Sequence, residues 1–554
     1  MTTFTTPGHD GFSQEPHDSV ERKPLGLIVA GSLSHGLDVK LSPDRSVEEV
    51  KVGRYVTIQG EQTRFFCMAS DVRLEATDAA LASTPPDLSD PLIAEVLRGT
   101  GTYGVVHVVP YLTRGPLQLQ PVRTVPAHYA PAYEATQEEI EEIFGAEDAQ
   151  HLWVGSPLDM EDTRIRLELP KLVERSSGVF GKSGTGKTYL TRILMAGILQ
   201  KGAAVQLIFD MHNEYGWRGT TEGPWGHVKG LKQLYSSQVA VFTLDQESSR
   251  AREVSTDGVV EIGYGELEVQ DIEDLRETLN LTDPMVQSLS ALEKSLGKRT
   301  WLADFLARDS EGMKELANQT NLHDGTLQGL QRRLNFLTRL QFLTPETRAN
   351  ATQQIMDYLE RGKTVVLEFG KYKDNELAQV LVANMLSRRI YDRWAERVDR
   401  ALGDKAKEPP QLIITIEEAH KFLNPRMAGQ TIFGTIAREM RKYKVTLLVV
   451  DQRPSAIDPE VLSQIGTKIT CLLDDEKDTS AILSGASGAG ELRSVLTRLE
   501  SVQQALIFGH AVPMPVVVRT RDYGSPESYR DFGFMEAAEL ERRAERDRRE
   551  LFGR

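Results

Sequence analysis

A run of eight residues has the types and spacing needed to hold a nucleoside triphosphate. Gly181–Thr188 reads GKSGTGKT and satisfies the pattern GxxxxGK[ST] at every fixed position. The glycines let backbone N–H groups surround the phosphates, while Lys187 reaches the β- and γ-phosphates and the Thr188 hydroxyl coordinates Mg²⁺. We therefore expect ATP and Mg²⁺ as cofactors, with the nucleotide bound by Gly181, Ser183, Gly184, Thr185, Gly186, Lys187, Thr188 and Tyr189.

Two adjacent carboxylates supply what a phosphate loop needs for hydrolysis. The apolar segment Leu412–Ile416 runs directly into Glu417 and Glu418. Hydrolysis requires one acidic group near Mg²⁺ and a residue that activates or orients the attacking water. We assign Glu417 to the Mg²⁺ side and Glu418 to the water. Most glutamate pairs are simply solvated, but this pair follows an apolar strand in a chain with an intact phosphate loop.

Polar residues also follow a second apolar segment, in Asp210–Tyr215. In an α/β sheet such residues lie near the ligand, because ligands bind at the carboxyl ends of the strands. Asp210 and Glu214 are candidates for orienting water or Mg²⁺, and Asp210 is a candidate metal ligand. His212 is either a contact to the ligand or a hydrogen-bonded loop residue.

Two more candidates are found further along the chain. Gln452 follows the apolar segment Val445–Val450 and is placed to sense the γ-phosphate through the attacking water. Arg438 and Arg441 lie in a basic stretch just before that segment. Arginines on helices are commonly exposed, but either one would offset negative charge in the transition state if it reached the phosphates.

The segments around these residues predict an α/β core with a largely parallel sheet. Continuous apolar runs are typical of parallel strands buried on both faces. We expect strands after the phosphate loop at Ala204–Phe209, Val239–Thr243, Thr364–Phe369, Gln411–Ile416, Val445–Val450 and Lys468–Leu473. Between two of them, residues 267–360 show helical apolar spacing, for example Leu327, Leu330, Leu334, Leu337 and Leu340. We interpret them as an inserted helical bundle used for packing or assembly.

Composition limits the possible settings. The chain has 554 residues, a net charge of −15 and only two cysteines, Cys67 and Cys471. Two cysteines exclude a disulfide framework, and no apolar run approaches the length of a membrane span. The polar segment 1–24 lacks the apolar core of a signal peptide and predicts a disordered leader. We expect a cytoplasmic protein that makes no membrane contact and binds nucleic acid through a local basic surface.

The motifs GKSGTGKT, DMHNEY, LIITIEEAHKFL, IAREMRKYKV and QRPS, in this order, resemble the HerA family of hexameric DNA-translocating ATPases in the HerA–FtsK group. The resemblance covers nearly the whole chain. It implies an α/β fold with a RecA-like P-loop core and parallel-rich sheet, an N-terminal small β-barrel and an inserted helical bundle. The expected boundaries are 1–24 leader, 25–150 barrel, 151–266 and 361–525 core, 267–360 bundle and 526–554 charged helix, a possible latch between subunits.

The same resemblance implies roles that spacing alone does not give. Glu418 would activate water, Gln452 would act as the sensor and Arg441 would be the arginine acting in cis. Arg175 resembles the arginine that a neighbouring subunit inserts into the site. Asn213 stands where the family commonly has glycine, which leaves the backbone of that loop in question.

The implied partners are double-stranded DNA in the channel of a homohexamer, and a NurA-type nuclease or another effector enzyme. Residues 215–233 and 424–430 are candidate DNA-contacting loops, and surface loops without that role are equally compatible with their composition. A conjugation-type or protein-remodelling motor of the same group is the alternative, because the motor motifs do not specify the polymer that is moved. A DEAH-type helicase would need a second core, for which the chain after Gln464 is too short.

Overall fold

A computed structural model describes residues 22–534 except 84–88, 90, 91, 93–95, 98, 99, 116, 117, 221–225, 348 and 349. The chain forms two compact units that divide between Ala135 and Thr136, so residue 150, the expected end of the barrel, falls inside the second unit. Most of the expected leader, the tip of one candidate DNA-contacting loop and residues 535–554 of the expected C-terminal helix lie outside the described residues.

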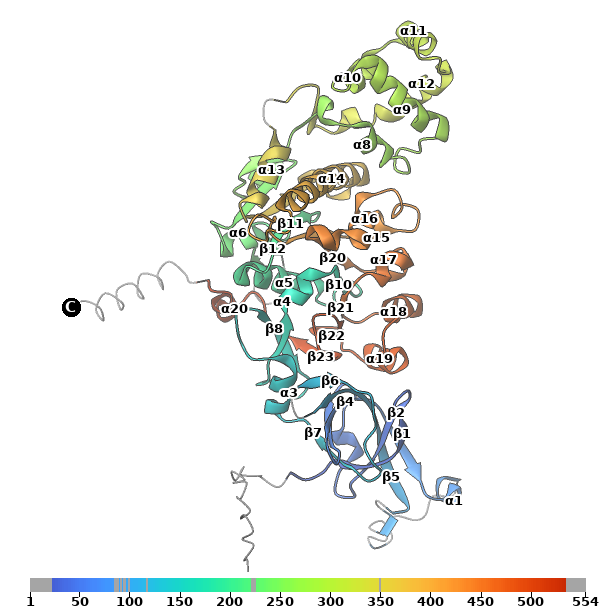
Figure 1. The fold of residues 1–554 in the computed structure, drawn as a ribbon, viewed down its shortest axis with the longest axis vertical. Helices are drawn as coiled ribbons and strands as arrows, with labels where there is room; N and C mark the ends of the chain where they lie inside the picture. The colour runs from blue at the N-terminus through green and yellow to red at the C-terminus, as the bar shows by residue number, and fades with distance from the viewer. Residues whose placement is uncertain are drawn as a thin grey trace, which may run out of the picture. The chain divides into compact units, whose positions relative to one another are not determined.

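The first unit contains the expected small barrel (Figure 1, blue). Among its described residues, six antiparallel strands close in the order β1-β7-β3-β4-β5-β2, because β2 pairs with both β1 and β5. Bulges in β4, between Phe66 and Cys67 and between Ala69 and Asp71, supply the bending that closure requires. The strands are β1 Gly26–Ser32, β2 Gly36–Leu41, β3 Tyr55–Gln59, β4 Arg64–Ala76, β5 Thr102–Arg114, β6 Leu119–Pro121 and β7 Pro131–Glu134.

The second unit is built on one mixed sheet, and the expected parallel-rich core is confirmed. Its described strands are ordered β15-β14-β18-β11-β19-β20-β10-β21-β22-β23-β8-β9. In this order, neighbouring strands from β15 to β21 pair in parallel. From β21 to β9 each neighbouring pair is antiparallel, beginning with β21 and β22. The strands are β8 His151–Pro157, β9 Ile165–Glu168, β10 Ser177–Phe180, β11 Val205–Asp210, β14 Val239–Thr243, β15 Gly258–Val259, β18 Thr364–Glu368, β19 Leu412–Glu417, β20 Val445–Asp451, β21 Thr467–Thr470, β22 Gln504–Gly509 and β23 Val516–Thr520.

The direction of the parallel strands defines two edges of this sheet. The ends of β10, β11, β18, β19 and β20 share one edge, called here the carboxyl edge, and their beginnings share the opposite amino edge. Figure 1 shows α16 to α19 on one side of the sheet and α6 and α20 on the other. The helices of this core are α3 Gln137–Phe144, α4 Leu169–Glu174, α5 Lys187–Lys201, α6 Leu231–Leu234, α7 Gln246–Ala251, α13 Ala351–Glu360, α14 Glu376–Ala401, α15 His420–Leu423, α16 Ile432–Glu439, α17 Pro459–Ser463, α18 Glu476–Leu483, α19 Ala489–Leu496 and α20 Pro526–Asp531.

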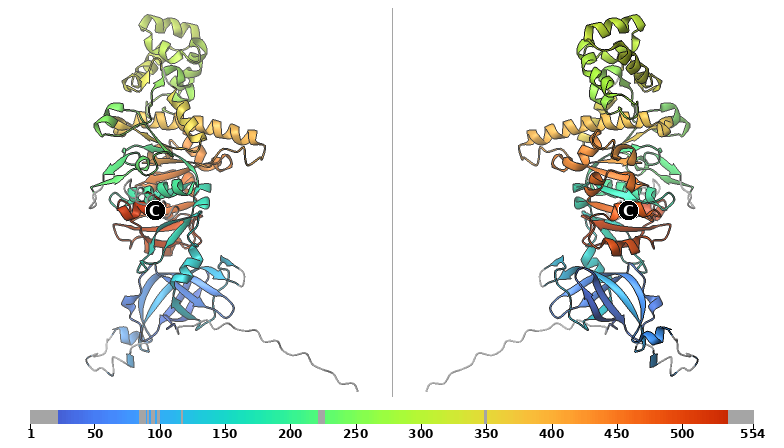
Figure 2. Two further views of the ribbon diagram at one scale, coloured as in Figure 1. Left: turned by 90° about the vertical axis from the view of Figure 1, so that its left-hand side faces the viewer. Right: turned by 90° about the vertical axis from the view of Figure 1, so that its right-hand side faces the viewer.

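The expected helical insertion lies between two short strands, β16 Ile262–Gly263 and β17 Leu343–Thr344, which pair with each other. Its helices are α8 Val269–Glu273, α9 Asp283–Leu296, α10 Trp301–Ala307, α11 Ser310–Thr320 and α12 Asp324–Leu334. The leucines that predicted helical spacing here are all buried, and Trp301 and Phe305 add large side chains to the same interior. The helices form a cluster seen at one end of the second unit in Figure 2.

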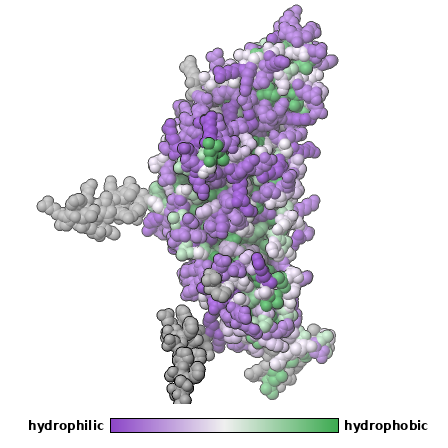
Figure 3. Space-filling model, in the orientation of Figure 1, coloured by the Kyte–Doolittle hydropathy of each residue, from purple (hydrophilic) through white to green (hydrophobic). Residues whose placement is uncertain are grey.

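The face of the protein seen in Figure 3 is mostly hydrophilic. It carries apolar side chains only in small groups between polar ones. No helix in the described part of the chain is long and apolar enough to cross a membrane.

Candidate nucleotide-hydrolysing site

The phosphate loop lies at the carboxyl edge, between the end of β10 and the start of α5. Gly181, Gly184 and Gly186 have φ values of 147°, 78° and 93°, which side chains other than glycine rarely adopt. Gly181 also has no room for a side chain, since an added Cβ would lie 2.8 Å from the Cβ of Cys471. The motif glycines are therefore required by the backbone, and the loop leads into α5 as the sequence predicted.

Lys187 is held inside the loop that it serves. Its Nζ donates a hydrogen bond to the carbonyl oxygen of Lys182 at 2.8 Å. Burial lowers the pKa of Lys187, and the nearby Glu417 and Glu418 carboxylates are among the groups that oppose this shift. The ammonium thus lies between the loop and the acidic residues on β19, where the β- and γ-phosphates of a nucleotide would neutralise it.

Glu417, at the end of β19, is a buried carboxylate with one oxygen in use. The Tyr215 hydroxyl donates to Glu417 Oε1 at 2.6 Å, and Oε2 has no hydrogen-bond partner among the described residues. Burial, with a contribution from Asp210, raises the pKa of Glu417 to about 8. A cation beside Oε2 would restore the charged form, because opposite charge favours ionisation.

The structure brings Glu418 and Gln452 together. Gln452 Nε2 donates to Glu418 Oε1 at 2.8 Å, so the expected water-activating and sensing residues are in direct contact. Glu418 has a φ of 47°, a left-handed conformation that costs a non-glycine residue about 1 kcal/mol or more. Such strain is typical of functional sites, and here it turns the side chain towards Gln452 at the end of β20.

A histidine that the sequence analysis left without a role joins this pair. His420 lies two residues after Glu418, and its Nδ1 is 3.0 Å from Asp451 Oδ2 and 3.7 Å from Glu418 Oε2. The Asp451 carboxylate also accepts the His420 backbone N–H at 2.7 Å. The hydrogen bond to Asp451 raises the pKa of His420. His420 and Asp451 therefore connect the ends of β19 and β20 behind Glu418.

The carboxylate of Asp210, a candidate metal ligand from sequence, accepts hydrogen bonds from the backbone of its own loop. It accepts the backbone N–H groups of Glu214, Tyr215 and Gly216 at 2.7, 2.8 and 3.1 Å. Burial raises the pKa of Asp210, and these three donors partly oppose the shift. In this structure Asp210 fixes the loop that delivers Tyr215 to Glu417.

The same loop explains the residue that stands in place of the family's glycine. Asn213 has a φ of 60°, in the left-handed region that glycine and asparagine adopt more readily than other residues. Its Oδ1 accepts the Gly370 N–H at 2.8 Å. Asn213 thus adopts a backbone conformation that suits glycine, and it links its loop to the segment after β18.

Glu368 was not predicted as a site residue, although it lies beside Asp210 in the sheet. The register pairs Asp210 with Glu368, which is 0% exposed. Arg252 forms an ion pair with Glu368 Oε2 at 2.5 Å, and burial raises the pKa of Glu368 to about 7. The sequence signal was weak, because one acidic residue at the end of an apolar run has no motif around it.

Arg192 was also missed. It lies on α5 with 2% of its surface exposed, and its Nη2 donates to the Glu214 backbone oxygen at 3.2 Å. The same nitrogen is 3.5 Å from Glu214 Oε2, and the guanidinium lies over the rings of Tyr189 and Tyr215. Arg192 therefore joins α5, the helix that follows the phosphate loop, to the loop after β11, which carries Glu214.

Two of the predicted arginines, Arg175 and Arg441, are not at this edge. Arg175 precedes β10 and Arg441 precedes β20, so both lie at the amino edge. Arg441 forms an ion pair with Glu174, and His510 Nε2 is 3.2 Å from Glu174 Oε2. These contacts lower the pKa of Glu174. Within one chain, the structure does not bring Arg441 to Glu418, contrary to the expected placement in cis, and the Arg175 side chain is exposed.

The residues around the loop suit Mg²⁺ held mainly by substrate. Among the described residues, no three His, Cys, Asp or Glu side chains are grouped to hold a metal by themselves. Mg²⁺ in nucleotide sites characteristically uses one or two protein oxygens, phosphate oxygens and water. Thr188 and the unpartnered Oε2 of Glu417 fit that requirement.

Comparison with known proteins agrees with this geometry. Residues 152–390 match the family described as the central domain of helicase HerA. The DNA double-strand break repair helicase HerA of Saccharolobus solfataricus is 26% identical over 392 residues, covering 70% of this chain and 72% of that protein. The protein of the same name from Sulfurisphaera tokodaii is 22% identical over 503 residues, covering 89% and 92%. Over these regions the chain is similar to the HerA family.

Solved structures that this chain matches include the plasmid coupling protein TrwB with a non-hydrolysable ATP analogue, at 12% identity and a TM-score of 0.46, covering 73% of this chain and 96% of that chain. VirB4 of Thermoanaerobacter pseudethanolicus has 14% identity and a TM-score of 0.43, covering 69% and 99%. With its complete phosphate loop and the Glu418–Gln452 pair, this chain, which is similar to HerA helicases, is a P-loop ATPase.

Both candidate DNA-contacting loops of this chain follow strands that end at the carboxyl edge. The first forms a hairpin of β12 Arg218–Thr220 and β13 His227–Lys229, and its tip, including Trp225, lies outside the described residues. The second, residues 424–430, exposes Arg426 and buries Met427 and Ala428.

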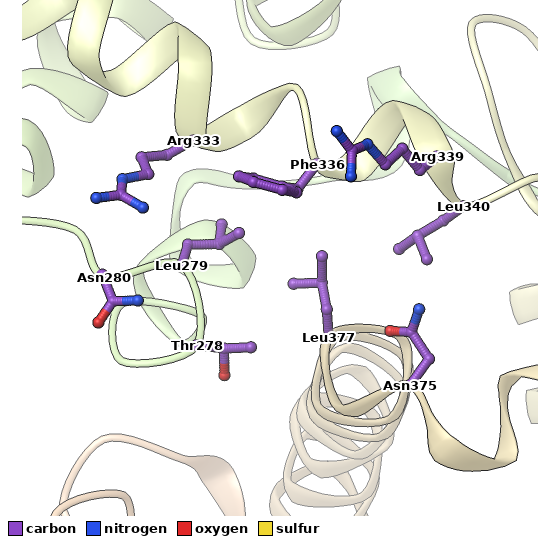
Figure 4. Close-up of a pocket in the computed structure, with 9 residues that line it drawn as sticks. All are labelled: Thr278, Leu279, Asn280, Arg333, Phe336, Arg339, Leu340, Asn375 and Leu377. Carbon is purple, nitrogen blue, oxygen red and sulfur yellow. The ribbon is translucent and has the colours of Figure 1, made fainter.

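A cavity of about 350 Å³ lies between the helical insertion and the first turn of α14. Figure 4 shows Arg333 and Arg339 on either side of Phe336, with Leu377 and Asn375 of the α14 start facing them. The Arg339 guanidinium is 4.8 Å from the centre of the Phe336 ring. This cavity offers positive charge and an aromatic face, separate from the phosphate loop.

Proposed function

We propose that this protein hydrolyses Mg²⁺-ATP to move along double-stranded DNA as a hexameric ring. The observation that carries the proposal is the convergence of Lys187, Glu418 and Gln452 at one edge of the sheet, in a chain similar to the HerA family. The relatives named as DNA double-strand break repair helicases favour DNA as the polymer. In a cell the motor would work with a NurA-type nuclease or another effector, in end processing or antiviral defence.

The chain's own groups have distinct tasks in hydrolysis. Lys187 and the loop N–H groups bind the phosphates, while Thr188 and Glu417 hold Mg²⁺, which neutralises charge on the phosphate oxygens when bound. Glu418 accepts the proton of the attacking water, and Gln452, hydrogen-bonded to Glu418, orients that water. Tyr215 and Asp210 keep Glu417 in place.

Arginine would come from the next subunit. Arg175 and Arg441 are both at the amino edge, and a ring that packs this edge against a neighbour's carboxyl edge would place them at the neighbour's γ-phosphate. An arginine supplied in trans stabilises charge in the transition state and makes turnover depend on assembly.

DNA would be gripped through its phosphates, because a translocase must hold any sequence. Arg218 and Arg426, on the two loops at the carboxyl edge, are exposed and carry the required charge. A salt dependence of DNA binding would follow from these contacts.

The test is ATPase activity with and without double-stranded DNA, for the wild type and Glu418→Gln. We expect stimulation of the wild type and a loss of about 100-fold or more in kcat for Glu418→Gln, because general base catalysis contributes on that order. Glu315→Gln, an exposed site on α11, is the matched control and should behave as wild type. Intact turnover in Glu418→Gln would reject the assigned base. ATPase activity indifferent to DNA would favour the alternative, a ring motor acting on another polymer.

A further inference from the structure

A second cavity, of about 440 Å³, opens at the carboxyl edge where β8, β23 and α20 meet. Its lining includes Trp153 and Ser156 of β8, and Gln503, Arg519, Thr520 and Asp522 around the ends of β22 and β23. Nothing in the hydrolytic geometry described above uses these residues. Gln503, Arg519 and Asp522 are exposed and so are available to a ligand.

The sheet places this cavity on the same edge as the phosphate loop. β22 is antiparallel to β21, and β23 is antiparallel to β22, so β23 runs in the direction of β10 and ends at the carboxyl edge. β10 and β23 are separated by two strands, which corresponds to about 14 Å at the usual strand spacing. An extended nucleoside triphosphate is long enough to cover that distance.

The cavity lies close to the phosphate loop. A Cβ built on Gly186 would lie 3.8 Å from the backbone nitrogen of Gln503, so Gln503 passes over the last glycine of the loop. The Gln503 carbonyl oxygen accepts the Thr520 N–H at 2.8 Å, which fixes its position against the end of β23. Gln503 has a φ of 59°, a left-handed conformation held by this arrangement.

The position of the hydrolytic residues sets the direction of the nucleotide. Glu418 and Gln452 follow β19 and β20, which lie on one side of β10. The γ-phosphate must lie on that side. The nucleoside must then extend to the other side of β10, over β21 and β22, towards the cavity at β23.

We propose that this cavity is the nucleobase subsite of the ATP site, and that Gln503 and Asp522 select adenine. The two side chains are neighbours, with Gln503 Nε2 3.5 Å from Asp522 Oδ1. Adenine presents its N6 amino group as a donor beside the N7 acceptor, whereas guanine presents two acceptors, O6 and N7. Asp522 accepts from N6 and the Gln503 amide donates to N7, so guanine would place O6 against a carboxylate.

The experiment measures affinities of the full-length protein for ATP, GTP and inorganic tripolyphosphate by calorimetry without DNA. We expect wild type to prefer ATP over GTP by about tenfold or more, the discrimination typical of a well-placed pair of hydrogen bonds. Asp522→Asn supplies an amide that can donate to O6, and we expect it to remove most of that preference by improving GTP. Gln503→Ala should weaken ATP and leave tripolyphosphate, which occupies only the phosphate loop, unchanged.

Asp304→Asn, an exposed change on α10 of the insertion, is the matched control and should keep the wild-type preference. An unchanged ATP-to-GTP ratio in Asp522→Asn, or equal wild-type affinities for the two nucleotides, would overturn the subsite. This inference rests on the ATP binding in the proposed function, and the two fail separately. Tight, selective ATP binding with no stimulation by DNA would reject translocation alone, and DNA-stimulated turnover with no base preference would reject the subsite alone.

Discussion

The two edges of the central sheet differ in the sign and in the burial of their charged side chains. At the carboxyl edge, Asp210, Glu368 and Glu417 are nearly or fully buried, and burial raises the pKa of each. At the amino edge, Arg175 and Arg441 are exposed, and the ion pair of Arg441 with Glu174 is open to solvent. The carboxyl edge thus holds a group of buried carboxylates, and the amino edge exposes arginine side chains to solvent.

In the proposed ring, each chain would supply two different parts of a catalytic unit, the buried carboxylates and the exposed arginines. Buried carboxylates in contact with one another are costly unless a cation joins them. An exposed arginine carries little desolvation cost. Its attraction to an anion becomes strong where an interface excludes water. We therefore predict that one chain is sufficient to bind the nucleotide, whereas fast hydrolysis requires a neighbouring chain.

The largest expected effect comes from breaking the amino edge. Arg175→Ala should lower kcat by about 1000-fold, as expected for an arginine supplied in trans, and leave ATP affinity unchanged in calorimetry. Arg332→Ala, in the helical insertion, is the matched control and should keep near-normal turnover.

Mixed assemblies sharpen the same comparison. Inactive Arg175→Ala and inactive Glu418→Gln proteins, mixed before assembly, should regain part of the activity, because some interfaces would join an intact base to an intact arginine. No recovery, in mixtures shown by mass measurement to contain both chains, would place Arg175 outside the neighbour's site.

A buried lysine in the sheet tests whether burial is the costly factor. Lys468 on β21 is 6% exposed and donates to the Ile482 carbonyl oxygen, and burial lowers its pKa from 10.5 to about 8. Folding therefore penalises its charged form fully below pH 8, and the penalty disappears as pH rises towards 10.5. Lys468→Met should stabilise the protein at pH 7 by up to about 3 kcal/mol and by almost nothing near pH 10.5.

The measurement is thermal melting of both proteins across that range. A difference between Lys468→Met and wild type that stays constant from pH 7 to 10.5 would show that the ammonium is not penalised by burial.

Tyr215→Phe should weaken the carboxyl edge with a smaller effect. The change removes the donor to Glu417 Oε1, and a buried acceptor without its partner costs about 1–3 kcal/mol. We expect kcat to fall about tenfold, with a KM for ATP near that of wild type. Tyr235→Phe removes a hydroxyl that donates to the Phe532 carbonyl oxygen and should lower stability without lowering kcat. Equal kcat losses in the two variants would mean that Tyr215 has only a structural role.

The smallest effect concerns the backbone at Asn213. Asn213→Gly and Asn213→Ala both lose the contact with Gly370, but only alanine must also adopt a φ of 60° with a Cβ. We expect Asn213→Ala to be less stable than Asn213→Gly by about 1 kcal/mol, as measured by denaturant titration. Equal stability of the two would show that the loop relaxes around this position.

The sequence predicted the parts of the site that occur together in one segment. The phosphate loop is one continuous segment. Glu418 and Gln452 each follow an apolar strand, and the change from apolar to polar residues marks where that strand ends. The alternation of strands and helices also predicted the parallel core, because that pattern reflects burial on both faces.

What could not be predicted is how distant segments meet. Glu368 and Asp210 are neighbours only through the register of β11 and β18. Arg192 is one of several polar residues on α5, and its contact with Glu214 depends on the loop after β11. The family resemblance implied that Arg441 acts in cis, whereas the direction of β20 puts it at the amino edge of its own chain.

The pairing of β16 with β17 has a consequence for how such a protein changes over evolutionary time. The inserted helices depart and return through two adjacent short strands, so their gain, loss or replacement would leave the order of the main sheet intact. A shortened gene encoding a brief linker in their place should still yield a folded motor. The insertion can therefore diversify while the residues of the nucleotide site are inherited unchanged.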